Sequence, residues 1–112
     1  MAEERSDLLQ GTLSLVILKA LLAGPRHGYA IARWVEATTA DVLRVDESSL
    51  YPALRRLEDR GWVNADWGTS ELGRKAKVYR LTPRGRRQLS LETEEWARFA
   101  AAISRVLLPS AI

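Results

Sequence analysis

The stretch Asp46–Gly61, with the sequence DESSLYPALRRLEDRG, decides the fold that this chain is expected to adopt. At 100° per residue its apolar side chains fall on one helical face, with the spacing i, i+3, i+4, i+7 of a core-facing stripe. These residues are Leu50, Ala53, Leu54 and Leu57. The other face carries Ser48, Pro52, Arg55, Arg56 and Asp59, with Tyr51 at the border. The stretch therefore predicts one amphipathic helix.

Residues near the two ends of this stretch predict where the helix begins and ends. Ser48 or Ser49 is expected to cap it by accepting a hydrogen bond from a free backbone N–H. Pro52 would then lie in or just after the first turn, where its missing N–H costs little. Gly61 would end the helix in a left-handed conformation. A face with hydroxyls and arginines suits a DNA major groove, but a solvated surface helix fits this segment equally well.

The composition is that of one soluble globular domain. The chain has 112 residues, of which 46% are hydrophobic and 28% are charged, and these values are ordinary for a single domain. No window approaches the roughly 18 consecutive apolar residues of a membrane span, and the start Met1–Arg5 does not resemble a secretory signal. The absence of cysteine excludes disulfides and thiolate metal sites. We therefore expect a cytoplasmic protein that does not bind membranes.

Positive charge is concentrated in one part of the chain. The net charge is only +3, and residues 1–50 carry more acidic than basic side chains. Residues 74–87, in contrast, contain no Asp or Glu, and their basic residues are Arg74, Lys75, Lys77, Arg80, Arg84, Arg86 and Arg87. A concentrated basic patch on a nearly neutral chain is typical of a surface that binds phosphates.

Two further helices are predicted before the central one. Residues 12–23 are apolar on nearly every side and end at a Gly-Pro pair, which predicts a buried core helix, whereas the polar residues 1–11 are expected to fray. A second helix is expected over residues 27–38. His27, the single histidine, is expected to cap this helix or to form a hydrogen bond and not to act as a catalyst.

After Gly61 the hydrophobic period changes from 3.6 to 2. Residues 62–67 and 76–81 both alternate between apolar and polar side chains, and a polar loop that contains glycine and is basic at its end joins them. This pattern predicts an antiparallel hairpin with a charged tip. Trp62, Trp67 and Tyr79 are expected to pack in the core or within the hairpin.

The last segment predicts a long helix. Thr82 and Pro83 form a strong helix start, and the helix is expected to end near Leu108, a length of roughly 37 Å. The preceding elements cannot cover all of so long a helix, so its apolar stripe is expected to form a dimer interface. The residues of this expected interface are Leu89, Trp96, Phe99, Ile103, Val106 and Leu107.

The order of three helices, a hairpin and a long helix indicates an α+β, mostly α, winged helix-turn-helix fold with a C-terminal dimerisation helix. We expect residues 1–82 to form the DNA-binding domain and residues 83–112 to form the dimerisation helix, within one compact unit. The third helix would enter the major groove of double-stranded DNA, while the hairpin wing would reach the adjoining backbone or minor groove.

Four segments of this sequence resemble the PadR family of transcriptional regulators. They are LLQGTL at residues 8–13, GPRHGY at residues 24–29, SLYPALRRLE at residues 49–58 and AKVYRLTPRG at residues 76–85. The resemblance covers roughly residues 8–108, and the combination of LYPAL with the strand exit YRLTPRG is specific. The resemblance implies a homodimeric, DNA-binding repressor of the shorter subtype, which has a single C-terminal helix.

The resemblance also implies a small effector, because some short members sense aromatic or hydrophobic molecules in a cavity at the dimer interface. Trp96 and Phe99 are placed to line such a cavity, although plain dimer packing explains both residues at least as well. The acidic residues Glu92, Glu94 and Glu95 beside Trp96 suggest a cationic aromatic ligand as a hypothesis.

Nine residues are expected to contact DNA through hydroxyl groups or positive charges. They are Tyr29, Ser48, Ser49, Tyr51, Arg55, Arg56, Arg74, Lys75 and Lys77. Core packing is an equally good explanation for Tyr29. Two wing residues depart from the family pattern: Glu71 would repel phosphate unless it pairs with a neighbouring cation, and Leu72 is apolar where a polar residue is usual.

Two other classes of function compete with DNA binding. A winged helix can also serve as a protein-interaction module without direct DNA binding, and such a module would show no salt-dependent binding to duplexes. An enzyme is not expected, because neither a nucleophile with its base nor a phosphate loop nor a metal cluster stands out. We accordingly expect no cofactor and no metal.

Overall fold

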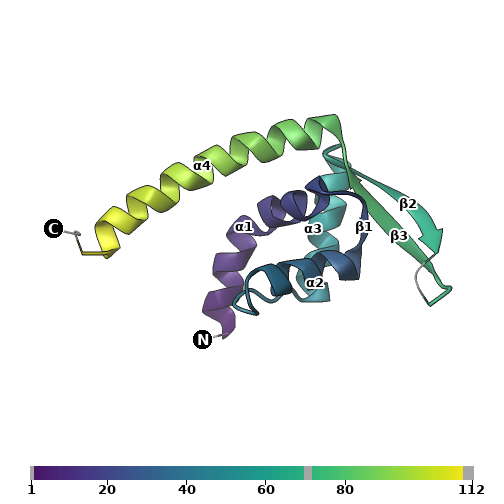
Figure 1. Cartoon of the computed structure of the whole chain (residues 1–112), viewed down its shortest axis with the longest axis horizontal. Helices are drawn as coiled ribbons and strands as arrows, with labels where there is room; N and C mark the ends of the chain where they lie inside the picture. The colour runs from purple at the N-terminus through teal and green to yellow at the C-terminus, as the bar shows by residue number, and fades with distance from the viewer. Residues whose placement is uncertain (1, 70–71, 110–112) are drawn as a thin grey trace.

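The computed structural model describes residues 2–69 and 72–109, with side chains described from residue 12 onward. Its elements follow in the order α1 (Ala2–Leu22), β1 (Arg26–His27), α2 (Gly28–Thr38), α3 (Glu47–Asp59), β2 (Val63–Thr69), β3 (Lys75–Leu81) and α4 (Pro83–Leu107). Figure 1 shows the first three helices as a bundle, with the sheet at one side and α4 extending across the top. The predicted fold class, mostly helical with a winged helix-turn-helix and a long last helix, is confirmed.

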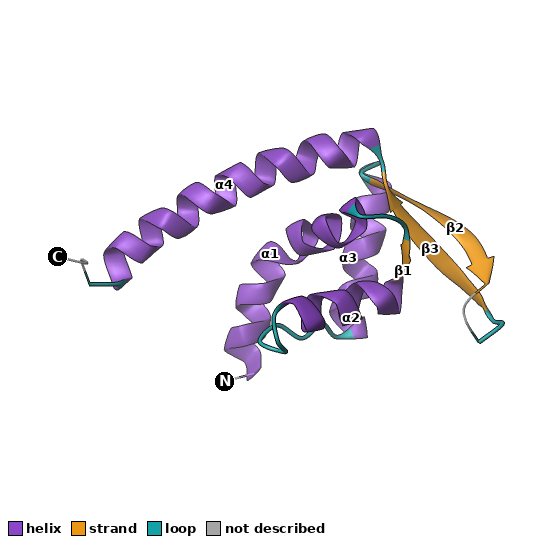
Figure 2. Ribbon diagram, viewed as in Figure 1, coloured by secondary structure: helices purple, strands orange, loops and turns teal. Residues whose placement is uncertain are grey.

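The three strands form one antiparallel sheet in the order β1-β3-β2 (Figure 2). In the hairpin Val63 pairs with Leu81 and Thr69 pairs with Lys75, so each predicted strand is slightly longer than the alternation indicated. Strand β1 was not expected, and it places Arg26 opposite Tyr79. Two residues are too few to show a period of 2, so only the pairing with β3 identifies them as a strand.

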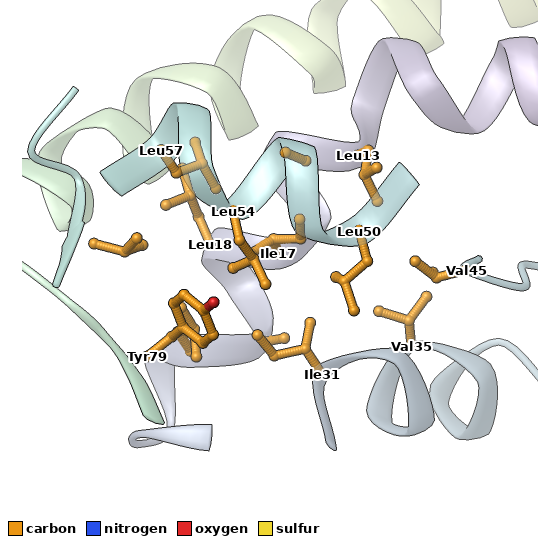
Figure 3. Packing of buried hydrophobic residues seen from close by; sticks show 14 of the residues in the cluster. Leu13, Ile17, Leu18, Ile31, Val35, Val45, Leu50, Leu54, Leu57 and Tyr79 are labelled. Atoms are coloured by element: carbon orange, nitrogen blue, oxygen red, sulfur yellow. The ribbon is translucent and has the colours of Figure 1, made fainter. Parts of the chain in front are cut away.

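The core lies between α1, α2 and α3 and is closed on one side by β3. In Figure 3, Leu50, Leu54 and Leu57 point from α3 toward Ile17 of α1 and its neighbours, as the stripe predicted. The cluster also includes Tyr79, which is 5% exposed. This packing fixes the orientation of α3, and its polar face consequently points away from the core.

Helix α1 begins earlier than predicted. It includes residues 2–11, which were expected to fray. Polarity was the wrong criterion there, because Glu, Arg, Leu and Gln all have high helix propensity and the segment contains no proline. The single Gly11 within it is tolerated at a cost of about 1 kcal/mol.

The N-terminus of α3 also differs from the prediction. The N-cap is Asp46, without a side-chain capping hydrogen bond, and Ser48 and Ser49 lie inside the first turn. Pro52 is therefore the sixth helical residue, where it cannot donate a hydrogen bond to the carbonyl of Ser48. Both residues are exposed, so water can solvate that carbonyl and the cost of the proline is reduced.

The predicted end of α3 is confirmed. Gly61 has φ +76°, in the left-handed region that glycine adopts without strain. The N–H of Trp62 donates to the carbonyl of Leu57 at 3.0 Å, and the N–H of Gly61 donates to the carbonyl of Glu58 at 3.0 Å. This pair of hydrogen bonds is the Schellman motif, which turns the chain from α3 into the wing.

Helix α4 begins as predicted and is joined to the end of α3. The hydroxyl of Thr82 accepts a hydrogen bond from the N–H of Gly85 at 3.0 Å and donates one to the carbonyl of Gly61 at 2.8 Å. Thr82 therefore caps α4 and ties it to the end of α3. From this anchor α4 crosses α1, and its C-terminal end extends past the other helices (Figure 1).

Candidate nucleic-acid interface

A groove of about 620 Å³ lies between α3 and the inner face of the wing. Four of the nine residues predicted to contact DNA line it: Tyr29 from the start of α2, Tyr51 and Arg55 from α3, and Lys77 from β3. They come from three separate elements, yet the fold brings them around one concave surface. The groove is therefore our candidate interface.

Tyr51 is held at the edge of this groove by its contact with Gly28. A Cβ added to Gly28 would lie 2.7 Å from the Tyr51 ring and 2.9 Å from its hydroxyl oxygen, so only glycine leaves room for the ring here. The side chain nevertheless stays 41% exposed. Partial burial raises the pKa of the Tyr51 phenol, and the Glu47 carboxylate raises it further. The hydroxyl thus remains protonated and can donate a hydrogen bond.

Lys77 reaches across the groove toward α3. Its Nζ atom lies 4.0 Å from Oε1 of Glu58 and 5.9 Å from the centre of the Trp67 ring, which it faces in a cation–π contact. Trp67 is the direct cross-strand partner of Lys77 in the hairpin. The lysine is therefore positioned from both sides, by an acid on α3 and by an aromatic ring on β2.

Tyr79 forms the floor of the groove beneath these residues. Burial raises the pKa of its phenol, and the charge of Glu58 and the neighbouring Tyr51 contribute in the same direction. The ring packs in the core, as predicted. The floor is therefore rigid and stays uncharged at neutral pH.

The other five predicted contact residues lie outside the groove lining. On α3, Ser48 and Arg56 are exposed and Ser49 is half-buried, while Arg74 and Lys75 are exposed on the wing. They extend the polar surface on either side of the groove. Glu71 lies outside the described residues, and Leu72 next to it is 80% exposed.

Seven of the residues that line the groove were not predicted to contact DNA, and three of these are His27, Trp67 and Glu58. His27 lies at the N-cap of α2, but its side chain forms no capping hydrogen bond. It stacks on Tyr29 instead, with ring centroids 5.6 Å apart, and its buried Nδ1 atom has no hydrogen-bond partner among the described residues, so the predicted capping role is wrong. Trp67 is 69% exposed and is not a core residue. Glu58 lies three residues after Arg55 on the same helix, and this spacing was the signal that could have placed it in the groove.

The apolar residues of α4 form a second exposed surface. Trp96, Phe99 and Ile103 are 49%, 65% and 40% exposed, and Val106 and Leu107 are 79% and 72% exposed. Leu89 needs a correction, because it is only 6% exposed and packs in the core of the same chain. The α4 apolar face, as we name it, therefore consists of Trp96, Phe99, Ile103, Val106 and Leu107.

Within residues 2–69 and 72–109, no group of three His, Cys, Asp or Glu side chains is arranged to hold a metal ion. None of the described helices is both long and apolar enough to cross a membrane.

Comparison with known proteins decides the family. Residues 17–91 match the transcriptional regulator PadR-like family. This chain belongs to the PadR-like family. The family consists of transcriptional regulators and not of enzymes, so membership confirms both the resemblance seen in the motifs and the prediction that the chain is not an enzyme.

Individual relatives agree with this assignment. An uncharacterised protein of Lysinibacillus sphaericus is 36% identical over 93 residues, which span 83% of this chain and 85% of that protein. A transcriptional regulator from Clostridium thermocellum has a similar structure, with 29% identity and a TM-score of 0.82 over 90% of this chain and 98% of the other. A PadR family regulator from Eggerthella lenta is 26% identical with a TM-score of 0.80, over 97% and 93% of the two chains.

Proposed function

We propose that this PadR-like regulator is a homodimeric repressor that binds a specific double-stranded DNA operator through α3 and the wing. The observation that supports this best is the groove, because Tyr29, Tyr51, Arg55 and Lys77 meet there from three elements. Neither a solvated helix nor a structural hairpin requires these side chains to converge.

The geometry of a winged helix assigns a role to each part of the groove. With α3 in the major groove and the wing at the adjoining minor groove, the phosphate strand that separates the two DNA grooves would lie over the protein groove. The hydroxyls of Tyr29 and Tyr51 would bond phosphates or base edges, and Arg55 would contact phosphate or guanine. Lys77, with Arg74 and Lys75 on the wing, would contact phosphate.

The α4 apolar face supports the proposal of a homodimer. Its residues recur at the spacing of a coiled-coil seam, and exposed apolar surfaces of this kind are unusual on monomers. We propose that residues 83–112 mediate dimerisation while residues 1–82 bind DNA. Two copies of the chain would then present two α3 helices to the two halves of one operator.

An effector site is proposed on the same helix. Trp96 and Phe99 are both exposed and are of the type that stacks on planar ligands, while Glu92, Glu94 and Glu95 favour a cationic one. Quenching of tryptophan emission by matched cationic and neutral planar dyes tests this proposal. Equal affinity for the two dyes would contradict the preference for a cation, and no quenching by either would contradict the site.

Fluorescence anisotropy tests DNA binding. The protein is titrated into the labelled duplex upstream of its own gene and into a scrambled duplex, at low and at physiological salt. We expect tighter binding to the native duplex, and a loss of about tenfold or more in Arg55→Gln. Lys19→Gln removes the same charge from the exposed side of α1 and should bind like the wild type. Binding to neither duplex at low salt would favour the protein-interaction module instead.

Sedimentation equilibrium tests the dimer separately. Phe99→Glu places a charge within the α4 apolar face, and we expect it to shift the protein to monomers at micromolar concentration, because an unpaired charge is costly in an apolar interface. Ala101→Glu introduces the same charge on the opposite side of α4 and should stay dimeric. A monomeric wild type would contradict the proposed interface.

A further inference from the structure

The groove contains two acids, Glu58 and Asp59, where a phosphate-binding surface needs none. Glu58 projects from α3 into a groove that also holds Arg55 and Lys77, and its carboxylate would repel a phosphate strand lying there. Its side chain is 37% exposed, so it is neither buried in the core nor fully in solvent. An acid beside two cations of a proposed phosphate-binding surface requires a reason.

The contacts of Lys77 supply a reason for the position of Glu58. Its ammonium group lies 4.0 Å from the Glu58 carboxylate, while the Trp67 ring faces it from the other strand. The lysine side chain is 41% exposed, so a phosphate can approach it from outside the groove. In the free protein, Glu58 therefore occupies the position beside Lys77 that a DNA phosphate oxygen would take.

We propose that Glu58 is a positioning residue that competes with the DNA phosphate for Lys77 and thereby limits the affinity of the protein for DNA. This inference rests on the proposed DNA-binding function. When DNA binds, Lys77 exchanges the carboxylate for a phosphate, and the freed Glu58 takes up a cation from solution. That uptake offsets part of the cation release from the DNA, so the Lys77 contact contributes less to the salt dependence of binding than an unpaired lysine would.

The slope of log K against log salt distinguishes this mechanism from a structural role for Glu58. Glu58→Gln keeps the size of the side chain and removes its charge. We expect it to steepen the slope by at most roughly 0.9 per protomer, the value for one phosphate contact, because no cation is taken up. We also expect it to raise low-salt affinity by roughly three- to tenfold, because repulsion close to the phosphate is removed. A residue that served only the fold would instead lower affinity when changed.

Asp59→Asn is the matched control for the groove. Asp59 also lines the groove but forms no ion pair with Lys77 among the described residues, so its loss should leave the slope unchanged. In the double variant Glu58→Gln/Lys77→Gln, the steepening of the salt slope that is expected for Glu58→Gln alone should disappear. A change of slope on Glu58→Gln that persists without Lys77, or an equal slope in Glu58→Gln and wild type, would overturn the proposal.

Lys77→Gln alone tests the idea even if Glu58→Gln does not fold. Because Lys77 is already paired with Glu58 in the free protein, its loss should weaken binding while flattening the slope less than the loss of an unpaired cation does. Arg55→Gln, which removes an arginine without such an internal partner among the described residues, should flatten the slope by roughly 0.9 per protomer. Equal flattening in both variants would contradict the inference. A wild type that binds no duplex would instead contradict the DNA-binding function.

Discussion

The α3–wing groove and the α4 apolar face are both exposed, but their side chains are held in different ways. In the groove, Tyr51 packs on Gly28 and Lys77 lies between Glu58 and Trp67, so polar groups are fixed before any partner arrives. Along α4, Phe99 and Val106 are 65% and 79% exposed and would be covered only by another surface. The comparison indicates that one chain suffices to build the groove, whereas the proposed role of the α4 apolar face requires a second chain.

Salt provides the largest expected contrast between the two regions. If the dimer neutralises about six phosphates, tenfold more salt should weaken DNA binding by roughly five decades. Dimerisation through apolar side chains should change by less than about tenfold over the same range, because screening acts on charges and not on apolar contact. Anisotropy and sedimentation series in the same buffers measure both, and a similar salt dependence of the two equilibria would remove the distinction.

The junction of the two regions is predicted to be intolerant of any side chain at Gly85. An added Cβ would overlap the carbonyl oxygen of Trp62 and lie 2.8 Å from Leu81. The backbone at Trp62 cannot move aside for the new methyl group as the end of a flexible side chain could. Gly85→Ala should therefore lower the free energy of unfolding by about 3 kcal/mol. Chemical denaturation measures this change. A matched Ala97→Gly change in the exposed part of α4 should cost only about 1 kcal/mol.

A substitution with a smaller expected effect, Gly28→Ala, tests whether DNA binding depends on the position of Tyr51 in the groove. Gly28→Ala would displace the Tyr51 ring, since the new Cβ comes within 2.7 Å of it, but the flexible end of a side chain can move aside. We expect DNA affinity to fall about tenfold, the worth of one lost hydrogen bond to a charged group, with an unchanged dimer by sedimentation. If Gly28→Ala in a Tyr51→Phe background lowers affinity as much as it does alone, the tyrosine hydroxyl is not the group that is displaced.

The loop that leads into α3 is predicted to store strain. Ala40 has φ +49° at the end of α2, where its N–H donates to Ala37 and the N–H of Asp41 donates to Glu36, in the Schellman pattern that usually contains glycine. Ala40→Gly should therefore stabilise the fold by about 0.5–1 kcal/mol, after the greater freedom of glycine in the unfolded chain is deducted. Thermal and urea unfolding test this, and DNA affinity should stay unchanged.

The groove floor should produce the smallest effect, a loss of stability in alkali. Burial raises the pKa of Tyr79 in the folded state above the value of about 10 in the unfolded chain. The associated stability is complete below about pH 10 and is lost as the pH rises through the folded-state pKa. Urea unfolding of Tyr79→Phe should show a shallower decline above pH 10 than the wild type. An equal decline in the free energy of unfolding above pH 10 in Tyr79→Phe and wild type would mean that Tyr79 does not contribute to the loss of stability in alkali.

Periodicity accounts for most of the fold that could be predicted. The 3.6 period of Leu50, Leu54 and Leu57 determines the buried face of α3, and Thr82–Pro83 marks the start of α4, because these signals depend on neighbours along the chain. The predicted start of α1 was wrong, because the polar residues before residue 12 were expected to be unstructured. Strand β1 and the exposure of Trp67 could not be predicted, since both depend on partners that lie far away in sequence.

The sequence by itself determined the family, the order of the helices and the hairpin, and the chemical character of the two surfaces, because motifs, hydrophobic periods and charge are local properties. It also identified four of the residues that line the groove. Only the tertiary structure decided that Glu58 stands beside Lys77, that Gly28 seats Tyr51 and that Leu89 belongs to the core. Each of these depends on how separate elements pack, and the packing brings together residues that no local pattern relates.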